Sequence, residues 1–297
     1  MDRLDAMRFF VRVVDRRSFT HAAADLDISR STATEVIQRL EERLRTRLLE
    51  RTTRHVSPTP DGEAYYRNCV TILSDIDETE RAFLGGEPSG LLRVDAPGPL
   101  TRTYLLPELP DFMSRFPEIE LQLGQGERLV DLVREGVDCV IRAGDPEESG
   151  LIRRALGQIE EITCASPAYL EVHGMPRSPD DLQSHHMIGF VSSRTHTVLP
   201  LEFQCGDTVR EIKLPCRTKV NDAETAHHLA ELGFGLIQAP RYRFRNAINS
   251  KKLTQVLASF PPPPLQLAAY YPQRRQLSPR VRVFLDWAAD VFARAEI

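Results

Sequence analysis

The sequence lacks long hydrophobic runs, and this excludes functions that depend on a membrane span. A helix crosses a bilayer with about 20 apolar residues, and no segment of the chain approaches that length. Arg3, Arg8 and Arg12 interrupt the amphipathic N-terminal segment, which therefore does not have the pattern of a signal peptide. We expect a cytoplasmic protein that has no membrane partner.

Cysteine is also scarce. Five cysteines, an odd number, are spread over 297 residues, a distribution that predicts no disulfide framework and fits a reducing compartment. Common catalytic motifs are missing, because the sequence has no phosphate-binding glycine loop, no Gly-x-Ser-x-Gly elbow and no His-Glu-x-x-His. The pairs His185-His186 and His227-His228 diverge on a strand or around a helix, so they predict no metal site. We expect neither an enzyme nor a cofactor.

What is present begins with residues 18–41, which have the pattern of two short helices joined by a tight turn. The first helix has a narrow apolar face, which consists of Ala22, Ala23 and Leu26. The second helix repeats apolar residues at the helical period, namely Ala33, Ile37, Leu40 and Leu44. We expect these residues to be buried, with Ile28 filling the turn and the opposite face of the second helix left polar.

Ser29 is a favourable N-cap, so the second helix is expected to begin at Arg30. A capped helix with a polar leading end and one buried face is typical of a helix-turn-helix, which places its second helix in the DNA major groove. The predicted DNA-binding residues of this helix are Ser29, Arg30, Ser31, Thr32, Thr34, Glu35 and Arg39. The alternative is an ordinary helical hairpin with solvated hydroxyl groups.

A short β-prone turn follows this helix and contains Arg51, Thr52 and Arg54. A wing at this point of the chain would touch DNA phosphates or the minor groove, and phosphate contact is our prediction. Residues 28–55 hold seven arginines against four glutamates, a local charge of +3 in a chain whose net charge is -4. The basic footprint is therefore confined to the part that is expected to meet DNA.

This order of features resembles that of the LysR-type transcriptional regulators, and the resemblance extends to residues 90–94 and 165–170 further along the chain. The resemblance implies an α/β protein with an N-terminal, all-α winged helix-turn-helix, a long linker helix and a two-lobed α/β effector domain like a periplasmic binding protein. It also implies a homodimeric or homotetrameric regulator whose DNA binding changes when a small molecule binds between the lobes.

Three positions depart from the pattern of that family. Glu35 stands where many members have a basic residue, Arg45 where glycine is usual and Pro58 where leucine is usual. A carboxylate near phosphates is repelled unless it accepts a hydrogen bond from a cytosine amino group or pairs with Arg39. The base preference at Glu35 is therefore not predicted.

Residues 61–83 have the pattern of one long helix, and a glycine-rich hinge follows at residues 85–90. Apolar residues recur along this helix at alternating steps of four and three, which is a heptad seam. The predicted dimerisation residues are Tyr65, Cys69, Ile72, Ile76 and Phe83. The alternative is a helix that packs on its own domain. A two-fold dimer would double the readout by binding both half-sites of an interrupted inverted repeat in double-stranded DNA.

Beyond the hinge, strand-like apolar runs alternate with helical stretches, a pattern that favours a parallel α/β sheet. The expected strands are residues 91–96, 119–123, 137–141, 162–165, 187–190 and 234–238. The expected helices are residues 105–116, 129–135, 222–232 and 278–295. We divide the chain into a DNA-binding domain at 1–60, a dimerisation linker and hinge at 61–90 and an effector-binding domain at 91–297. The resemblance implies two lobes in that last domain, with residues 91–161 and 266–297 in one and residues 162–265 in the other.

Ligands of open α/β sheets bind beyond the carboxyl ends of the strands, where helix N-termini attract anions. The residues expected there in the first lobe are Pro97, Gly98, Thr101, Arg102, Gln125 and Arg142. The residues expected on the opposing wall are Phe190, Phe203, Asp222 and Gln238. Thr101 is the first choice, and Arg142 either binds an effector carboxylate or pairs with Asp138 or a neighbouring backbone group. Capping or packing is the alternative role at each position, and an unidentified organic anion is the expected effector.

Two other functions stay open at this point. Some LysR-type members sense peroxide through two cysteines in the second lobe, and Cys205 and Cys216 lie in a comparable stretch. A Gly206-Asp207 turn between two predicted strands would keep these cysteines from facing one another, and no dense cluster of positive charge activates either thiol. The second alternative is a solute-binding protein with a degenerate DNA module.

Overall fold

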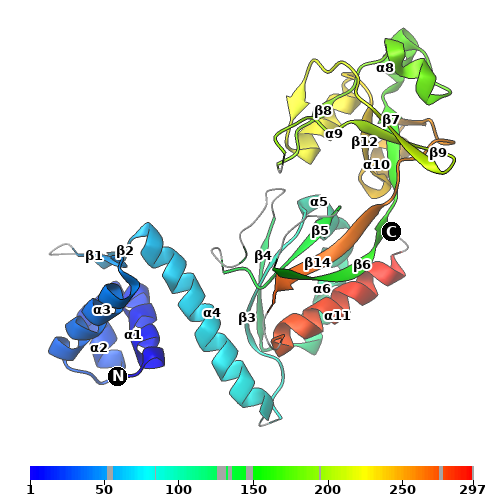
Figure 1. Ribbon diagram of the computed structural model, residues 1–297. Coiled ribbons are helices and arrows are strands. Elements are labelled where there is room, and N and C mark those ends of the chain that lie inside the picture. Colours follow the sequence, from blue (N-terminus) through cyan, green and yellow to red (C-terminus); the bar gives the residue numbers. More distant parts are fainter. Residues whose placement is uncertain are drawn as a thin grey trace.

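The computed structural model of the chain describes residues 1–51, 56–83, 85–125, 132, 136–144, 150–193, 195–273 and 277–295. Within these ranges, six residues are described by their backbone alone: Arg30, Arg51, Glu78, Thr79, Ala82 and Phe83. Figure 1 shows three parts in chain order, which are an N-terminal helical module, one long helix and a pair of lobes that contain the larger sheets.

The N-terminal module combines three helices with a two-stranded antiparallel wing: α1 (Arg3–Arg16), α2 (Phe19–Asp25), α3 (Arg30–Leu44), β1 (Leu49–Arg51) and β2 (Val56–Pro58). Each helix begins after a side chain that accepts a hydrogen bond from the backbone N–H three residues on. Ala22 and Ala33 are fully buried, which lets α2 and α3 approach closely. Leu44 is 37% exposed, contrary to expectation, because the last turn of α3 extends past the core, and Val36 is buried instead.

The long helix α4 (Pro60–Phe83) packs along its first half against α1. The ring centroids of Tyr65 and Phe10 are 5.3 Å apart, and Cys69 is fully buried in the core of the N-terminal module. The expectation that Cys69 contacts a second copy is therefore wrong, because the core of its own module encloses it. Tyr65 is partly buried and packs against the same core. Ile72, in contrast, is 40% exposed.

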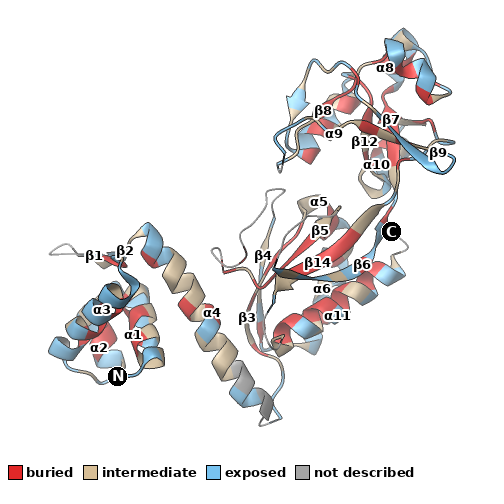
Figure 2. Ribbon diagram, viewed as in Figure 1, coloured by how far each residue is buried: buried red, intermediate tan, exposed pale blue. Residues whose placement is uncertain are grey.

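Lobe 1 is built on a five-stranded sheet in the order β4-β3-β5-β14-β6. Its strands are β3 (Gly90–Asp95), β4 (Ile119–Gly124), β5 (Cys139–Ala143), β6 (Leu151–Ile159) and β14 (Leu265–Pro272). Its helical elements are α5 (Gly98–Leu100), the π-helical turn η1 (Thr101–Leu105), α6 (Leu106–Arg115) and α11 (Pro279–Arg294). Figure 2 shows buried residues along β5, β14 and one side of α11, where the core of the lobe lies.

Lobe 2 contains a three-stranded antiparallel sheet in the order β12-β7-β13 and two further strand pairs. Its strands are β7 (Glu161–Ala165), β8 (Gly189–Phe190), β9 (Leu201–Cys205), β10 (Thr208–Ile212), β11 (Lys219–Val220), β12 (Ile237–Pro240) and β13 (Thr254–Val256). Its helices are α8 (Pro167–His173), the 3-10 helix η2 (Pro179–Ser184), α9 (Ala223–Glu231) and α10 (Arg241–Asn249).

The expected parallel sheet is only partly right. Strand β3 runs parallel to β4 and β5, but β14 runs antiparallel to β5 and β6. The reason is topological, because β6 leads out of lobe 1 toward β7 and β14 returns to it from β13. The chain thus passes between the lobes at residues 159–161 and 256–265. The helix expected at residues 129–135 lies outside the described residues except for residue 132.

Candidate DNA interface and effector site

The exposed leading end of α3 carries a cluster of hydroxyl groups. The Ser29 hydroxyl accepts a hydrogen bond from the backbone N–H of Thr32 at 3.2 Å, and it lies 2.8 Å from the hydroxyls of both Ser31 and Thr32. These three side chains are exposed, whereas Thr34 is partly buried and the side chain of Arg30 lies outside the described residues. The helix therefore presents preoriented donors and acceptors at the end that is predicted to enter the major groove.

Glu35 and Arg39 form an ion pair one turn further along α3. The Arg39 guanidinium lies 2.5 Å from the Glu35 carboxylate, and the two side chains are 75% and 56% exposed. This pairing is one of the two roles expected for Glu35. It places a positive charge beside the carboxylate, which lowers the repulsion that DNA phosphates would otherwise exert on it.

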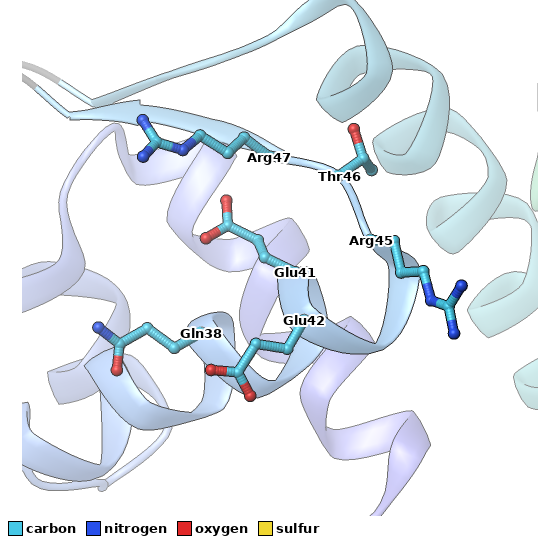
Figure 3. A pocket seen from close by; sticks show the side chains of 6 residues that line it. All are labelled: Gln38, Glu41, Glu42, Arg45, Thr46 and Arg47. Atoms are coloured by element: carbon cyan, nitrogen blue, oxygen red, sulfur yellow. The ribbon is translucent and has the colours of Figure 1, made fainter.

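The wing is held to α3 by Glu41. One carboxylate oxygen of Glu41 accepts hydrogen bonds from the backbone N–H groups of Leu48 and Leu49, at 2.8 and 3.1 Å. Beside it lies an open polar hollow of about 490 Å³, which is lined by Gln38, Glu41, Glu42, Arg45, Thr46 and Arg47 (Figure 3). Sequence reasoning missed Glu41, because its partners follow seven and eight residues later without a local motif.

Other predicted wing residues are described in part. Arg51 stands opposite Val56 in the antiparallel pair of β1 and β2, and only its backbone is described. Thr52 and Arg54 lie outside the described residues. The phosphate contacts of these residues therefore stay predictions.

Four of the residues predicted to bind an effector come together where α5 begins. Arg102 donates a hydrogen bond to the Gln125 side-chain oxygen at 3.4 Å, directly over Gly98. A Cβ at Gly98 would lie 3.0 Å from both of these side chains, so the glycine leaves them room. Pro97 is the N-cap residue of α5. A guanidinium and an amide thus converge just past the carboxyl ends of β3 and β4.

Lobe 2 meets this group through α9 and α10. The Arg102 guanidinium lies 3.7 Å from the Glu224 carboxylate, and the ring centroids of Tyr104 and Tyr242 are 5.2 Å apart. Each pair joins η1 of lobe 1 to a helix of lobe 2. Sequence reasoning missed Tyr104 and Tyr242, because contacts between the lobes leave no periodic or local signal.

Thr101 has no exposed surface, and its hydroxyl has no hydrogen-bond partner among the described residues. Its backbone N–H donates to the carbonyl of Pro97 at 2.9 Å, which fixes the residue where α5 passes into η1. A buried hydroxyl without a partner costs about 1 to 3 kcal/mol. A ligand atom that reached this hydroxyl would recover that free energy.

Arg142 has a different partner from those expected. Its guanidinium lies 2.6 Å from the Asp95 carboxylate and donates to the carbonyl of Ile141 at 2.9 Å. The Arg142 and Asp95 side chains are 13% and 12% exposed. The neighbouring backbone was among the expected partners, and Asp95 was not. An effector carboxylate would have to displace Asp95 from Arg142.

Both aromatic residues predicted on the opposing wall belong to the interior of lobe 2. Phe203 is fully buried in a hydrophobic cluster, because β9 turns this side chain toward the core. Phe190 is partly buried and packs against the second cluster of the lobe. The expectation that Phe203 contacts an effector is wrong.

The polar residues predicted on that wall also have structural roles. The Gln238 amide accepts from the backbone N–H of Glu202 at 2.7 Å and donates to the Glu202 carbonyl at 2.7 Å and to the Thr163 hydroxyl at 2.9 Å. Gln238 therefore fastens β9 to the central sheet of lobe 2. Asp222 accepts from the backbone N–H of Thr225 at 2.7 Å and caps α9. These contacts correct the prediction that either side chain is reserved for a ligand.

The two histidine pairs do not converge. His185 lies 3.2 Å from the Tyr169 hydroxyl through Nδ1, and His227 contacts Glu231 within α9 at 3.2 Å. Across the described ranges, no group of three or more histidine, cysteine, aspartate or glutamate side chains could hold a metal ion. In the same ranges, no helix combines the length and the apolar character that a membrane span requires.

Two family models match the chain: "Bacterial regulatory helix-turn-helix protein, lysR family" at residues 4–63 and "LysR substrate binding domain" at residues 85–293. The chain belongs to the LysR family. The HTH-type transcriptional regulator YhjC of Escherichia coli K12 is 39% identical over 293 residues, which cover 98% of each chain. The HTH-type transcriptional repressor PA14_22550 of Pseudomonas aeruginosa is 35% identical, over 99% of this chain and 93% of its own.

A solved LysR-type structure agrees with the fold. The structure of CrgA from Neisseria meningitidis has a TM-score of 0.59 and 30% sequence identity, and the match covers 97% of this chain and 98% of CrgA. The chain is thus a LysR-type transcriptional regulator with a helix-turn-helix DNA-binding domain and a two-lobed α/β regulatory domain.

Two departures from the LysR pattern have local explanations. Arg45 ends α3 with a φ of 54°, a left-handed conformation that glycine adopts readily and that costs other residues about 1 kcal/mol. Pro58 ends β2, an edge strand, where a missing backbone N–H is tolerated. Neither departure breaks the module.

The cysteines of the redox alternative lie in the expected hairpin. Strands β9 and β10 pair antiparallel around Gly206 and Asp207, with Cys205 at the end of β9 and Cys216 beyond β10. Both side chains pack against the hydrophobic core of lobe 2. Packing of this kind is the ordinary structural use of a cysteine.

We predict that Thr101→Val stabilises this LysR-type regulator. The substitution keeps the shape of the side chain and removes a buried hydroxyl that lacks a partner, so the free energy of unfolding should rise by about 1 kcal/mol. Urea titration of the full-length protein measures the change, with Thr103→Val at an exposed position as the control. A lower stability for Thr101→Val would show that the hydroxyl has a partner in the resting protein.

We also predict a pH dependence that arises at Glu161, where the chain enters lobe 2. Burial, followed by the negative charge of Glu202, raises the pKa of Glu161 to about 7, and Arg243 opposes the shift. Because the unfolded chain holds this proton less tightly, the free energy of unfolding falls as pH rises from about 4.5 to about 7.

Replacement of Glu161 by Gln removes this pH-dependent loss in the free energy of unfolding. Glu161→Gln should therefore gain about 2 kcal/mol relative to the parent between pH 5 and pH 8. Urea titrations at the two pH values measure the gain, and Glu171→Gln at an exposed position is the control. If the free energies of unfolding of Glu161→Gln and the parent differ by the same amount at both pH values, the raised pKa of Glu161 is contradicted.

Proposed function

We propose that this regulator binds an interrupted inverted repeat as a homodimer or a dimer of dimers, and that a small organic anion bound between its lobes changes that binding. The observation that carries the DNA-binding part is the leading end of α3. Its hydroxyl groups are exposed and held in place by the Ser29 cap, while the opposite face of the helix is buried. A helix of this kind can enter a major groove without unfolding the module that carries it.

Dimerisation is proposed because one winged helix-turn-helix reads only a few base pairs, and a two-fold dimer reads two half-sites. Ile72 supports the proposal, since it is an exposed aliphatic side chain on α4. Ile76 follows one turn later and is partly buried. We place the dimer contact on this second half of the seam.

The effector is proposed to bind where Arg102 and Gln125 meet, close to Thr101. A guanidinium, an amide and the N-terminal end of a helical segment are groups that bind carboxylates. Arg102 already lies beside the Glu224 carboxylate of the other lobe. An effector anion that replaced Glu224 at Arg102 would alter the contact between the lobes. It would shift the equilibrium between the arrangements with and without the Arg102–Glu224 contact only if its affinity for the two arrangements differed.

The roles of two groups of arginines can be separated by experiment. Arg30→Ala should cost about 1 to 3 kcal/mol and relax the preference at one base position, because it removes a predicted base contact. Arg51→Ala and Arg54→Ala should weaken binding to all sequences and lower the salt slope by about one each, because they remove predicted phosphate contacts.

Selection from randomised sites and titrations at several salt concentrations measure both effects. An unchanged base preference for Arg30→Ala would remove that residue from the readout. An altered base preference with an unaltered salt slope for Arg51→Ala would contradict its assignment to a phosphate.

A further inference from the structure

The contact between α4 and lobe 1 contains a fully buried cation. Arg280, in the first turn of α11, has no exposed surface. Its guanidinium lies 2.6 Å from the carboxylate of Asp75 on α4 and 3.6 Å from the carboxylate of Asp138 in lobe 1. A buried guanidinium is costly unless carboxylates neutralise it, and here the two carboxylates come from two separate parts of the protein.

The two carboxylates are held differently. Asp138 directly precedes β5, its side chain is 3% exposed, and its second oxygen accepts from the backbone N–H of Arg93 on β3 at 2.9 Å. Asp138 and Arg280 both belong to lobe 1, so they stay together whatever α4 does. Asp75 is 26% exposed and belongs to the linker helix. Only Asp75 leaves if α4 moves away.

The rest of the contact between α4 and lobe 1 is also polar. Arg93 donates to the hydroxyl of Thr71 on α4 at 3.4 Å, and Arg81 of α4 donates to the hydroxyl of Ser89 at 2.7 Å. Thr71 and Ser89 are 5% and 4% exposed, so these groups are buried by the contact. Polar contacts between parts of one chain resemble transient interfaces rather than a continuous core.

We propose that Arg280 is a releasable latch between lobe 1 and the linker helix. In the latched arrangement Arg280 pairs with Asp75 and holds α4 against lobe 1. In the released arrangement the guanidinium moves fully onto Asp138, so Arg280 keeps a charged partner when α4 leaves. Asp138 thereby lowers the cost of release, whereas Asp75 raises it.

Release would change the placement of the DNA-binding module. Helix α4 carries that module firmly, because Cys69 lies in its core and Tyr66 donates to Asp15 of α1 at 2.6 Å. Strand β5 begins directly after Asp138 and contains Arg142, which pairs with Asp95 beside the proposed effector site. One strand of lobe 1 therefore connects the latch to that site.

Hydrogen exchange of the full-length protein, followed by mass spectrometry without any ligand, tests the latch. Asp75→Asn should speed the exchange of amides in residues 67–81 by about tenfold, because the undocked arrangement becomes more populated. Asp138→Asn should slow the same amides, because it removes the carboxylate charge onto which Arg280 moves in the released arrangement. Glu80→Gln, which removes a carboxylate from the same helix at an exposed side chain, is the matched control and should change nothing.

The opposite signs separate a latch from a purely structural network, in which both substitutions would speed exchange. Faster exchange in Asp138→Asn overturns the proposal, and so does unchanged exchange in Asp75→Asn. If Asp138→Asn does not fold, the comparison of Asp75→Asn with Glu80→Gln decides by the same criterion. The hydrogen-exchange measurements need no DNA. A failure of the proposed DNA-binding function would appear in DNA-binding assays and would not change the exchange rates.

Discussion

Replacement of Ile72 and Ile76 together by aspartate is expected to convert the protein from dimers into monomers. The two positions lie one turn apart on α4, beyond Cys69, and Ile72 is 40% exposed. In a dimer that packs these faces together, four carboxylates would be buried without cationic partners, at a cost of several kcal/mol. Dimer dissociation should therefore rise by at least about a thousandfold.

Sedimentation at several protein concentrations measures this outcome. Val172→Asp is the matched control, because Val172 is an aliphatic residue of lobe 2 that is 78% exposed and lies outside the seam. This control should leave the dimer intact. A double variant that stays dimeric at low concentration would show that another surface holds the chains together.

Gly62→Ala is expected to disrupt the N-terminal module and abolish DNA binding. A Cβ on Gly62 would lie 1.9 Å from the carbonyl oxygen of Leu48 and 2.8 Å from its carbonyl carbon. These are backbone atoms, and the same carbonyl accepts a hydrogen bond from the backbone N–H of Thr59 at 2.9 Å. Neither α4 nor the backbone at Leu48 can therefore move to relieve the clash without a large cost in free energy. We expect a loss of more than about 3 kcal/mol in the free energy of unfolding of the module.

Thermal melting followed by circular dichroism, together with DNA titration, measures the two effects. Glu63→Ala alters the next residue of α4, which is exposed, and should retain both stability and binding. Normal stability and normal binding in Gly62→Ala would mean that α4 does not approach Leu48 as closely as the structure has it.

The DNA module was predictable from sequence because its determinants are local. The Ser29 cap, the alanines at the crossing of α2 and α3 and the apolar period of α3 all act within a few turns. Leu44 was wrongly expected to be buried. The helical period of apolar residues predicts which face of α3 is buried, but it does not predict how far the hydrophobic core extends along that face. One position of the heptad seam was misassigned for the same reason, since Cys69 is apolar and correctly placed, yet its neighbour is α1 of the same chain.

The regulatory domain was harder because its determinants lie far apart in the chain. Strands β6 and β14 pair across more than a hundred residues, as in the register of Ile159 with Leu265, and neither was expected. Phe203 was misassigned because an apolar residue on a strand can face either side until its neighbours are known. The partner of Arg142 was missed because Asp95 lies on another strand, 47 residues earlier.

Titration of the full-length protein against the DNA upstream of its own coding sequence tests whether this chain is a sequence-specific regulator. A gel-shift titration should compare that DNA with a shuffled sequence of equal length and composition at several salt concentrations. A sequence-specific LysR-type regulator is predicted to bind the upstream DNA at least about a thousandfold more tightly than the shuffled DNA at physiological salt. Equal affinity for both, with weak binding that disappears as salt rises, would contradict the account and indicate a degenerate DNA module.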